Sequence, residues 1–192
     1  PEVTLLPGVI LEGNTKIGSR STVGPDCRLV DTVVGSEVVI SQTVAREVEI
    51  ENNATVGPWA SLRPGTRVGK SAHIGTFVEI KNSDIGEEAK VPHLAYIGDT
   101  DIGPRANIGA GTITANYDGR EKHRTQIGQD AKLGSNTVLV APVTVGDGAY
   151  TAAGAAVVDD VPPGALAKGV PAEIEKDWVK KNRPSRDSKG KS

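Results

Sequence analysis

Large aromatic side chains are scarce in this chain, since Phe, Trp and Tyr make up 3% of its 192 residues, and methionine is absent. Aromatic residues dominate the cores of ordinary globular domains, so their scarcity argues against a core of that kind. The composition suits a narrow core filled by stacked Val, Ile and Leu side chains, as in repeat proteins.

Cysteine, net charge and long apolar runs are also lacking. The single cysteine, Cys27, excludes an internal disulfide and weakly favours a reducing compartment; its ordinary role is that of a small buried hydrophobe. A net charge of -2 leaves no broad nucleic-acid footprint. No apolar run approaches the length of a membrane span, and no signal peptide is evident. We therefore expect a cytoplasmic protein with neither nucleic acid nor a membrane as a partner.

A six-residue repeat is the strongest pattern present. Val68, Ile74, Ile80 and Ile85 follow one another in steps of six, six and five residues, and many such aliphatic residues precede a glycine. A hexapeptide repeat predicts a parallel β-helix in which three short strands, one for each step, form one triangular coil. Each aliphatic side chain then points inward, and the glycine takes the corner because it tolerates unusual backbone angles.

The repeat also predicts the limits of the domain. We expect an all-β β-helix over residues 1–161, with a loop excursion at 115–125, where the chain is longer than the repeat requires. Polar excursions on a rigid scaffold often carry function. Prolines at 162 and 163 are expected to stop strand pairing, followed by a tail over 162–181 with a short helix. Residues 182–192 are expected to be disordered.

The coil period places one histidine at the foot of a column of small residues. His93, Ala110, Ser135 and Ala153 occupy equivalent positions in successive coils, which lie about 4.8 Å apart. An extended, thin ligand suits such a column. His93 is a candidate general base, because imidazole accepts a proton near neutral pH; the alternative is a structural or surface histidine.

Two cations one coil apart form a second candidate site. Arg63 and Lys81 are separated by a single coil period and would repel each other on adjacent rungs. A bound phosphate would turn that repulsion into attraction. The alternative is a solvated pair whose aliphatic stems cover apolar surface.

The other two histidines suggest no metal site. His73 precedes an inward-pointing residue and is expected at a corner, and His123 lies in the polar loop. No two histidines have the spacing of metal ligands, so no metal is expected.

Several longer segments resemble one family. They are Leu62–Gly65, Phe77–Lys81, Pro92–Asp99, Asn107–Thr112, Asn116–Gly119 and Val140–Gly146. Together they are similar to the C-terminal acetyltransferase domain of the bacterial bifunctional GlmU family, from roughly Pro7 to Trp178. The chain starts abruptly at Pro1, as if within a repeat, so we expect it to be cut from a longer protein. No Gly-rich nucleotide loop opens it, so we expect the family's uridyltransferase domain to be absent.

This resemblance implies a left-handed parallel β-helix and a homotrimer with sites near its subunit interfaces. Handedness does not follow from the period, and left-handed coiling departs from the usual crossover rule. The implied enzyme is glucosamine-1-phosphate N-acetyltransferase, with acetyl-CoA as co-substrate. It makes N-acetylglucosamine 1-phosphate for UDP-N-acetylglucosamine and peptidoglycan precursors.

The resemblance also implies roles for individual residues. His93 matches the catalytic base of a direct transfer. The residues that match sugar-phosphate contacts are Arg63, Lys81, Tyr96, Asn107, Asn116 and Lys122. Those that match contacts to acetyl-CoA are Ala110, through its backbone N–H, Asn116, Tyr117, Ser135 and Ala153. Lys168 stands where family members often carry an Arg for the CoA phosphates, and Trp178 either stacks on adenine or packs a tail helix.

Three other classes share parts of this pattern. A different hexapeptide acyltransferase, acting on serine or a nucleotide sugar, would not need Arg63 and Lys81 to meet a small sugar phosphate. A γ-type carbonic anhydrase would need three well-placed histidine ligands. A non-catalytic assembly module would leave the His93 column without a purpose.

Overall fold

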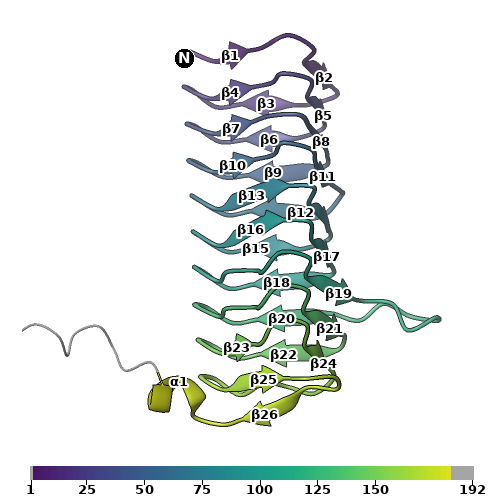
Figure 1. Ribbon diagram of the computed structural model, residues 1–192. Coiled ribbons are helices and arrows are strands. Elements are labelled where there is room, and N and C mark those ends of the chain that lie inside the picture. Colours follow the sequence, from purple (N-terminus) through teal and green to yellow (C-terminus); the bar gives the residue numbers. More distant parts are fainter. Residues whose placement is uncertain (1, 183–192) are drawn as a thin grey trace, which may run out of the picture.

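The computed structural model describes residues 2–182. They form one column of stacked coils with three faces, and each coil adds a short strand to a face (Figure 1). Strands of successive coils pair in parallel on all three faces, so the expected all-β parallel solenoid is confirmed. The expected disorder of 182–192 concerns residues beyond the described range, apart from Asn182.

The first face carries His93, at the end of one of its strands. Its strands are β1 (Thr4–Leu5), β4 (Thr22–Val23), β7 (Val39–Ile40), β10 (Thr55–Val56), β13 (His73–Thr76) and β16 (Lys90–His93). Single bridges at Asn107 and Lys132 continue this face to β23 (Tyr150–Thr151), so it runs the length of the column.

The second and third faces complete the prism. The second holds β2 (Ile10–Glu12), β5 (Arg28–Val30), β8 (Thr43–Arg46), β11 (Ala60–Leu62), β14 (Glu79–Lys81), β17 (Tyr96–Gly98), β19 (Ile113–Ala115), β21 (Val138–Val140) and β24 (Ala156–Val157). The third holds β3 (Lys16–Ile17), β6 (Val33–Val34), β9 (Val48–Ile50), β12 (Thr66–Val68), β15 (Asp84–Ile85), β18 (Thr100–Ile102), β20 (Thr125–Ile127) and β22 (Val143–Val145).

The core consists of aliphatic columns inside the prism. Ile74, Val91 and Ile108 occupy equivalent places on the first face, and all three are fully buried. Burial of such a side chain contributes about 1.5–3 kcal/mol of transfer free energy. Stacking identical registers therefore compensates for the scarcity of aromatic residues, and it holds the outward-pointing residues of each rung in line.

Gly24 (φ 114°) and Gly57 (φ 101°) have the unusual backbone angles that the repeat predicted, but most glycines that follow an aliphatic residue are required for another reason. Gly69, Gly86 and Gly103 do not have left-handed backbone angles. A Cβ on Gly86 would instead lie 2.7 Å from the carbonyl carbon of Gly103, because coil backbones stack closely there. Left-handed angles occur at other corner residues, including Phe77 (φ 55°) and Leu94 (φ 49°), which are not glycines.

Two departures from regular coiling stand out. The segment between β19 and β20 projects away from the prism (Figure 1). At the C-terminal end the pairing continues past residue 161, because β25 (Leu166–Lys168) pairs in parallel with β23. An antiparallel strand, β26 (Glu173–Glu175), and the helix α1 (Trp178–Asn182) follow. No helix within residues 2–182 has the length and hydropathy needed to span a membrane.

Candidate active site

The histidine column has the register that the coil period predicts. Thr76 and His93 are partners in the pairing of β13 with β16. The Gly111 N–H donates to the His93 carbonyl (3.3 Å), and the Asn136 N–H donates to the Ala110 carbonyl (2.7 Å). His93 and Ala110 thus lie on adjacent rungs, with Ser135 on the next.

Three backbone donors of this column are open. Among residues 2–182, the N–H groups of Ala110, Ser135 and Ala153 donate to no protein acceptor. His93, Ser135 and Ala153 are exposed, and Ala110 is half-buried. A row of open donors beside an exposed imidazole suits a ligand that carries carbonyl groups at intervals.

His73 is placed differently from the expectation. It lies within β13 rather than at a corner, is half-buried, and its Nδ1 is 2.7 Å from the Thr55 hydroxyl. Burial lowers the pKa of His73, and the nearby His93 and Lys90 lower it further. His73 therefore supports the strand below His93.

The predicted cation pair is present, and each cation has a carboxylate partner. The pairing of Leu62 with Ile80 sets Arg63 and Lys81 on adjacent rungs. Arg63 contacts Glu79 at 2.9 Å, and the Lys81 ammonium contacts Asp99 at 3.3 Å. The prediction of repulsion between Arg63 and Lys81 did not consider these carboxylates. They allow the two cations to lie on adjacent rungs without a bound anion.

A third cation comes from the projecting loop. Lys122 pairs with Tyr117 across the base of the loop. A contact with the Lys81 side chain, and the Lys81 charge, lower the pKa of Lys122, with a smaller contribution from the Arg63 charge. Lys122 as a neutral acceptor, together with the Asp99 carboxylate, raises the pKa of Lys81. Lys122 therefore lies beside Lys81, with Arg63 on the adjacent rung, and such a group of cations suits a phosphate group.

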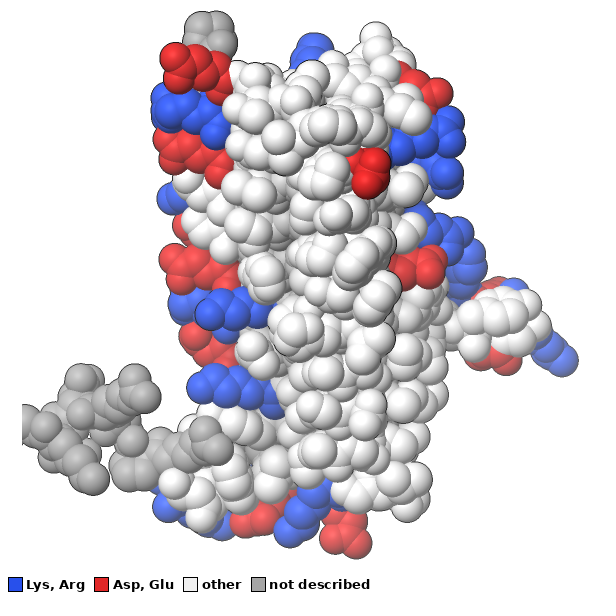
Figure 2. All heavy atoms as spheres, turned by 45° about the horizontal axis from the view of Figure 1, so that its top comes forward, with Lys and Arg blue, Asp and Glu red and all other residues white. Residues whose placement is uncertain are grey.

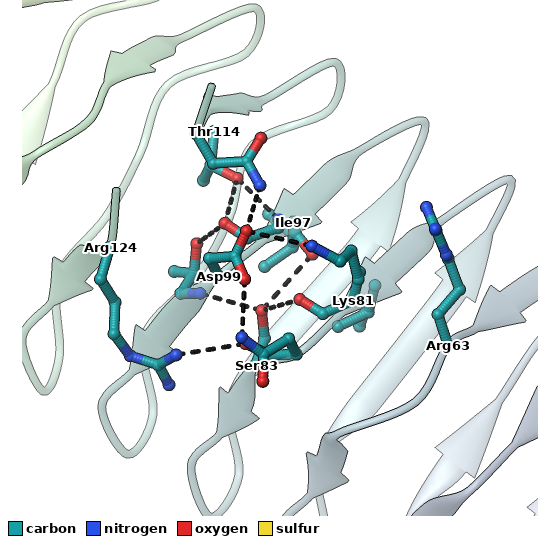
Figure 3. Close-up of polar contacts among 12 residues, drawn as sticks. Arg63, Lys81, Ser83, Ile97, Asp99, Thr114 and Arg124 are labelled. Atoms are coloured by element: carbon teal, nitrogen blue, oxygen red, sulfur yellow. Dashed lines mark hydrogen bonds and ion pairs between the residues drawn. The ribbon is translucent and has the colours of Figure 1, made fainter. Parts of the chain in front are cut away.

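Asp99 lies beneath these cations and is 7% exposed. Figure 3 shows its carboxylate at the centre of a polar cluster, directed toward Lys81. Burial alone would raise the pKa of Asp99, but hydrogen bonds from Asn82, Asn116 and Lys81 outweigh burial and lower it. Asp99 is thus a buried, ionised carboxylate whose charge is compensated. Its position one coil beyond Lys81 was a sequence signal for this pair.

Gly98 leaves room for two of the predicted residues to meet. A Cβ at position 98 would lie 2.6 Å from the Asn116 amide nitrogen and 2.6 Å from the Tyr96 hydroxyl. Asn116 is buried at 6% exposure, and Tyr96 is half-buried. The structure therefore brings Tyr96 and Asn116 together beside Lys81.

Three predicted residues lie outside this cluster. Asn107 is at the far end of its rung from Ala110, in a cavity of about 470 Å³ lined also by Lys90 and Lys132. Tyr117, at 60% exposure, projects with the loop. Lys168 is exposed, contacts Glu175 at 3.3 Å, and lies one rung beyond Ala152. Within a single chain these residues do not meet the Lys81 cluster.

In the tail helix, the Trp178 ring packs against Tyr150, with ring centroids 5.3 Å apart. Of the two alternatives for Trp178, the structure therefore shows packing of the tail on the prism.

Within residues 2–182, no three His, Cys, Asp or Glu side chains are grouped as a metal site requires.

Known proteins match this chain in its repeat and its fold. Residues 124–158 match the family described as bacterial transferase hexapeptide (six repeats). The perosamine N-acetyltransferase of Caulobacter crescentus, solved in complex with CoA and GDP-perosamine, is 28% identical, with a TM-score of 0.57 over 65% of this chain and 57% of that chain. The Francisella novicida UDP-N-acetylglucosamine acyltransferase, at 18% identity and a TM-score of 0.69 over 96% of this chain and 75% of that chain, shares the fold.

Sequence relatives are much closer. The bifunctional protein GlmU of Streptomyces avermitilis is 52% identical over 180 residues, which are 93% of this chain and 37% of that protein. The GlmU protein of Micrococcus luteus is 52% identical over 188 residues, 97% of this chain and 38% of that protein. The chain thus spans less than two-fifths of the length of these relatives. Over nearly its whole length, it is a homologue of the GlmU proteins, in the part that forms their C-terminal acetyltransferase domain.

Proposed function

We propose that this domain transfers the acetyl group of acetyl-CoA to the 2-amino group of glucosamine 1-phosphate. The products are N-acetylglucosamine 1-phosphate, which supplies UDP-N-acetylglucosamine and cell-wall precursors, and free CoA. The observation that carries the proposal is the grouping of Lys81 and Lys122, with Arg63 on the adjacent rung. The exposed His93 ends β16, the strand before β17, and β17 pairs with the strand that carries Lys81. Homology to the GlmU proteins supports the same reaction.

The site residues divide into two groups by their chemistry. The three cations hold the phosphate, while Tyr96, Asn107 and Asn116 contact the sugar. His93 takes a proton from the ammonium form of the amino group, so that a neutral nitrogen attacks the thioester carbonyl carbon. The C–S bond then breaks, the new amide nitrogen loses its second proton, and the departing thiolate takes up a proton. The acetyl group passes directly from sulfur to nitrogen, without an acyl-enzyme intermediate.

The open backbone donors serve the acetyl-CoA side. The Ala110 N–H lies one rung from His93 and stabilises the negative charge that develops on the thioester oxygen. Ser135 and Ala153 continue the same row and hold the CoA arm, with Asn116 and Tyr117 near the acetyl group. Lys168 lies one rung further and meets the CoA phosphates in place of the Arg found in many relatives.

We also propose a homotrimer whose subunits share each site. Trp59 and Phe77 stack at 5.3 Å on an exposed corner, and Leu94 on the next rung is 61% exposed. Figure 2 shows a strip along the column that is largely free of charged side chains, and charge depletion is typical of the centre of an interface. A second copy seated there would bring a neighbour's Asn107 or Tyr117 to the Lys81 cluster.

The test of the reaction is release of free thiol from acetyl-CoA, with glucosamine 1-phosphate, glucosamine, serine and a nucleotide-linked amino sugar as acceptors. Preference for glucosamine 1-phosphate supports the proposal. Preference for the nucleotide sugar would favour another hexapeptide acyltransferase. Metal analysis of the active protein tests the carbonic anhydrase alternative. Both substrates are metabolites of the cytoplasm, which is the compartment we propose.

The shared site has its own test. Light scattering gives the mass of the assembly. His93→Ala and Asn107→Ala proteins are then dissociated, mixed and reassembled. Recovered activity in the mixture supports sites built from two subunits, because mixed assemblies contain some intact sites. A mixture as inactive as its parents, with mixed assemblies verified by mass, would contradict shared sites.

A further inference from the structure

The carboxylate of Asp99 joins the phosphate-binding strand to the projecting loop. Its Oδ2 accepts from the Lys81 ammonium at 3.3 Å and from the side-chain amide of Asn116. Its Oδ1 accepts from the Asn82 amide at 2.6 Å. One oxygen is therefore shared between a phosphate-binding cation and the first residue of the loop.

The backbone of Asp99 ties the other end of the same loop. Its carbonyl accepts from the Thr125 N–H at 3.1 Å, and its N–H donates to the Lys81 carbonyl at 2.9 Å. The loop also closes on itself, since the His123 N–H donates to the Asn116 carbonyl at 2.8 Å. Both ends of the loop thus meet Asp99, and so does the rung that carries Lys81.

The burial of Asp99 makes the hydrogen bonds to its carboxylate necessary. A carboxylate at 7% exposure is costly unless its oxygens are paired. Asp99 has three side-chain donors around it. Its left-handed backbone (φ 49°) is shared by corner residues of other coils, such as Glu47 and Asn82, and is therefore a property of the coil. A buried charge with three side-chain donors is more than the anchoring of a surface loop requires.

We propose that Asp99 is a positioning residue that holds the loop carrying Tyr117 and Lys122 in register with Lys81. This role rests on the proposed function, in which Lys81 and Lys122 bind one phosphate while Asn116 lies beside the reacting groups. When Asp99 is intact, the phosphate and the amino group are held relative to a single carboxylate. Without it, the substrate is still attracted by the cations but is not aligned.

The alternative role of Asp99 is purely electrostatic, and it predicts the opposite kinetics. A negative charge beneath the cations weakens their attraction for phosphate. If that were its only effect, Asp99→Asn would lower KM for glucosamine 1-phosphate and leave kcat unchanged. The positioning role predicts a lower kcat, because alignment is what the substitution removes.

The experiment compares Asp99→Asn with a matched control, Asp31→Asn. Asp31 directly follows a strand of the second face, as Asp99 does, and has the same left-handed backbone (φ 46°). Its exposed carboxylate accepts from the Asn14 N–H and contacts no site residue. For Asp99→Asn we expect kcat to fall at least ~10-fold, with KM for acetyl-CoA within ~2-fold of wild type. For Asp31→Asn we expect kcat within ~3-fold of wild type. A fall in KM for the sugar phosphate at constant kcat would overturn the proposal.

A double-mutant cycle separates positioning from lost stability. Placed on Asn116→Ala, the Asp99→Asn substitution should cost less than ~3-fold more in kcat, because the two side chains act through one contact. Full multiplication of the two losses would contradict the role. The folded fraction of each variant is checked by circular dichroism and light scattering.

The crystal structure of the Asp99→Asn protein decides the matter independently of turnover. Displacement of the loop relative to Lys81 supports the role, and an unmoved loop overturns it. If wild type fails to acetylate glucosamine 1-phosphate, the proposed function fails. The structural comparison would then still judge Asp99 by itself.

Discussion

The Gly111 N–H donates to the carbonyl oxygen of His93 at 3.3 Å, which sets Ala110 one rung from the imidazole. Because successive rungs of a sheet lie about 4.8 Å apart, a base and a backbone donor face one ligand from neighbouring coils. We expect His93→Asn to lower kcat at least ~100-fold, the lower range for losing a general base. KM for both substrates should change little.

His73 provides the matched control for that substitution. It lies on the same face, and its partner is Thr55 rather than a substrate. Thiol release by His73→Asn should stay within ~5-fold of wild type, a change expected from support of a neighbouring strand. Equal losses in the two variants would mean that the imidazole of His93 has no special part in proton transfer.

Lys81→Met should weaken recognition of the phosphate group. We expect KM for glucosamine 1-phosphate to rise ~10-fold or more, since a charge-assisted contact is lost and Asp99 is left without its cation. With glucosamine, which lacks the phosphate, the variant and wild type should differ far less. The control is Arg105→Met, whose cation pairs with Asp130 on the surface. A similar loss with both acceptors would contradict phosphate binding at Lys81.

Binding of the sugar phosphate should weaken at high pH. The pKa of Lys122 is lowered by its contact with Lys81, so Lys122 loses its charge below the pH at which an ordinary lysine does. The charged form binds phosphate, and attraction is therefore lost as pH rises through this lowered pKa. The measurement is kcat/KM for glucosamine 1-phosphate from neutral pH upward. In Lys122→Met this alkaline loss should be reduced, whereas in Lys90→Met it should match wild type.

One glycine substitution should mainly lower activity, and another should mainly lower stability. A Cβ on Gly98 meets the ends of two site side chains, Asn116 and Tyr96, which can move aside. A Cβ on Gly103 would lie 2.5 Å from the backbone nitrogen of Gln129, which cannot. We expect Gly98→Ala to reduce activity at least ~10-fold with little loss of stability. Gly103→Ala should lower the free energy of unfolding by about 1–3 kcal/mol, as overpacking does, and a denaturant titration distinguishes the two.

Cys27 should be inert in the folded protein. It is 1% exposed, and burial raises the pKa of its thiol, so the reactive thiolate is disfavoured. We expect slow labelling by a thiol reagent under native conditions and rapid labelling in denaturant. Cys27→Ala should retain wild-type turnover. Rapid labelling of the native protein would show that the strand beside Cys27 opens readily.

Much of the candidate site was predictable because a coil period converts sequence separation into spatial separation. His93 and Ala110 are one coil period apart in the sequence, as are Arg63 and Lys81, and each pair lies on adjacent rungs. The aliphatic side chains fill the core, and only one register of stacking lets every coil bury its aliphatic side chains.

Other features were not predictable from the period. The continuation past Pro162 depends on β25 pairing with β23, although two prolines precede it. Most glycine corners are explained by the close stacking of coil backbones, which the sequence of a single coil does not show. Asp99 stands one coil beyond Lys81, but the period does not say that its side chain turns inward beneath the cations.

The sequence by itself determined the coil, its register and the residues that share a column, because a short repeat with one buried position per strand admits a single way of stacking. Only the tertiary structure decided which side chains meet across columns. The loop returns Lys122 to Lys81 and ties Asn116 to Asp99. Those contacts depend on how the loop excursion bends back, where no repeat constrains the chain.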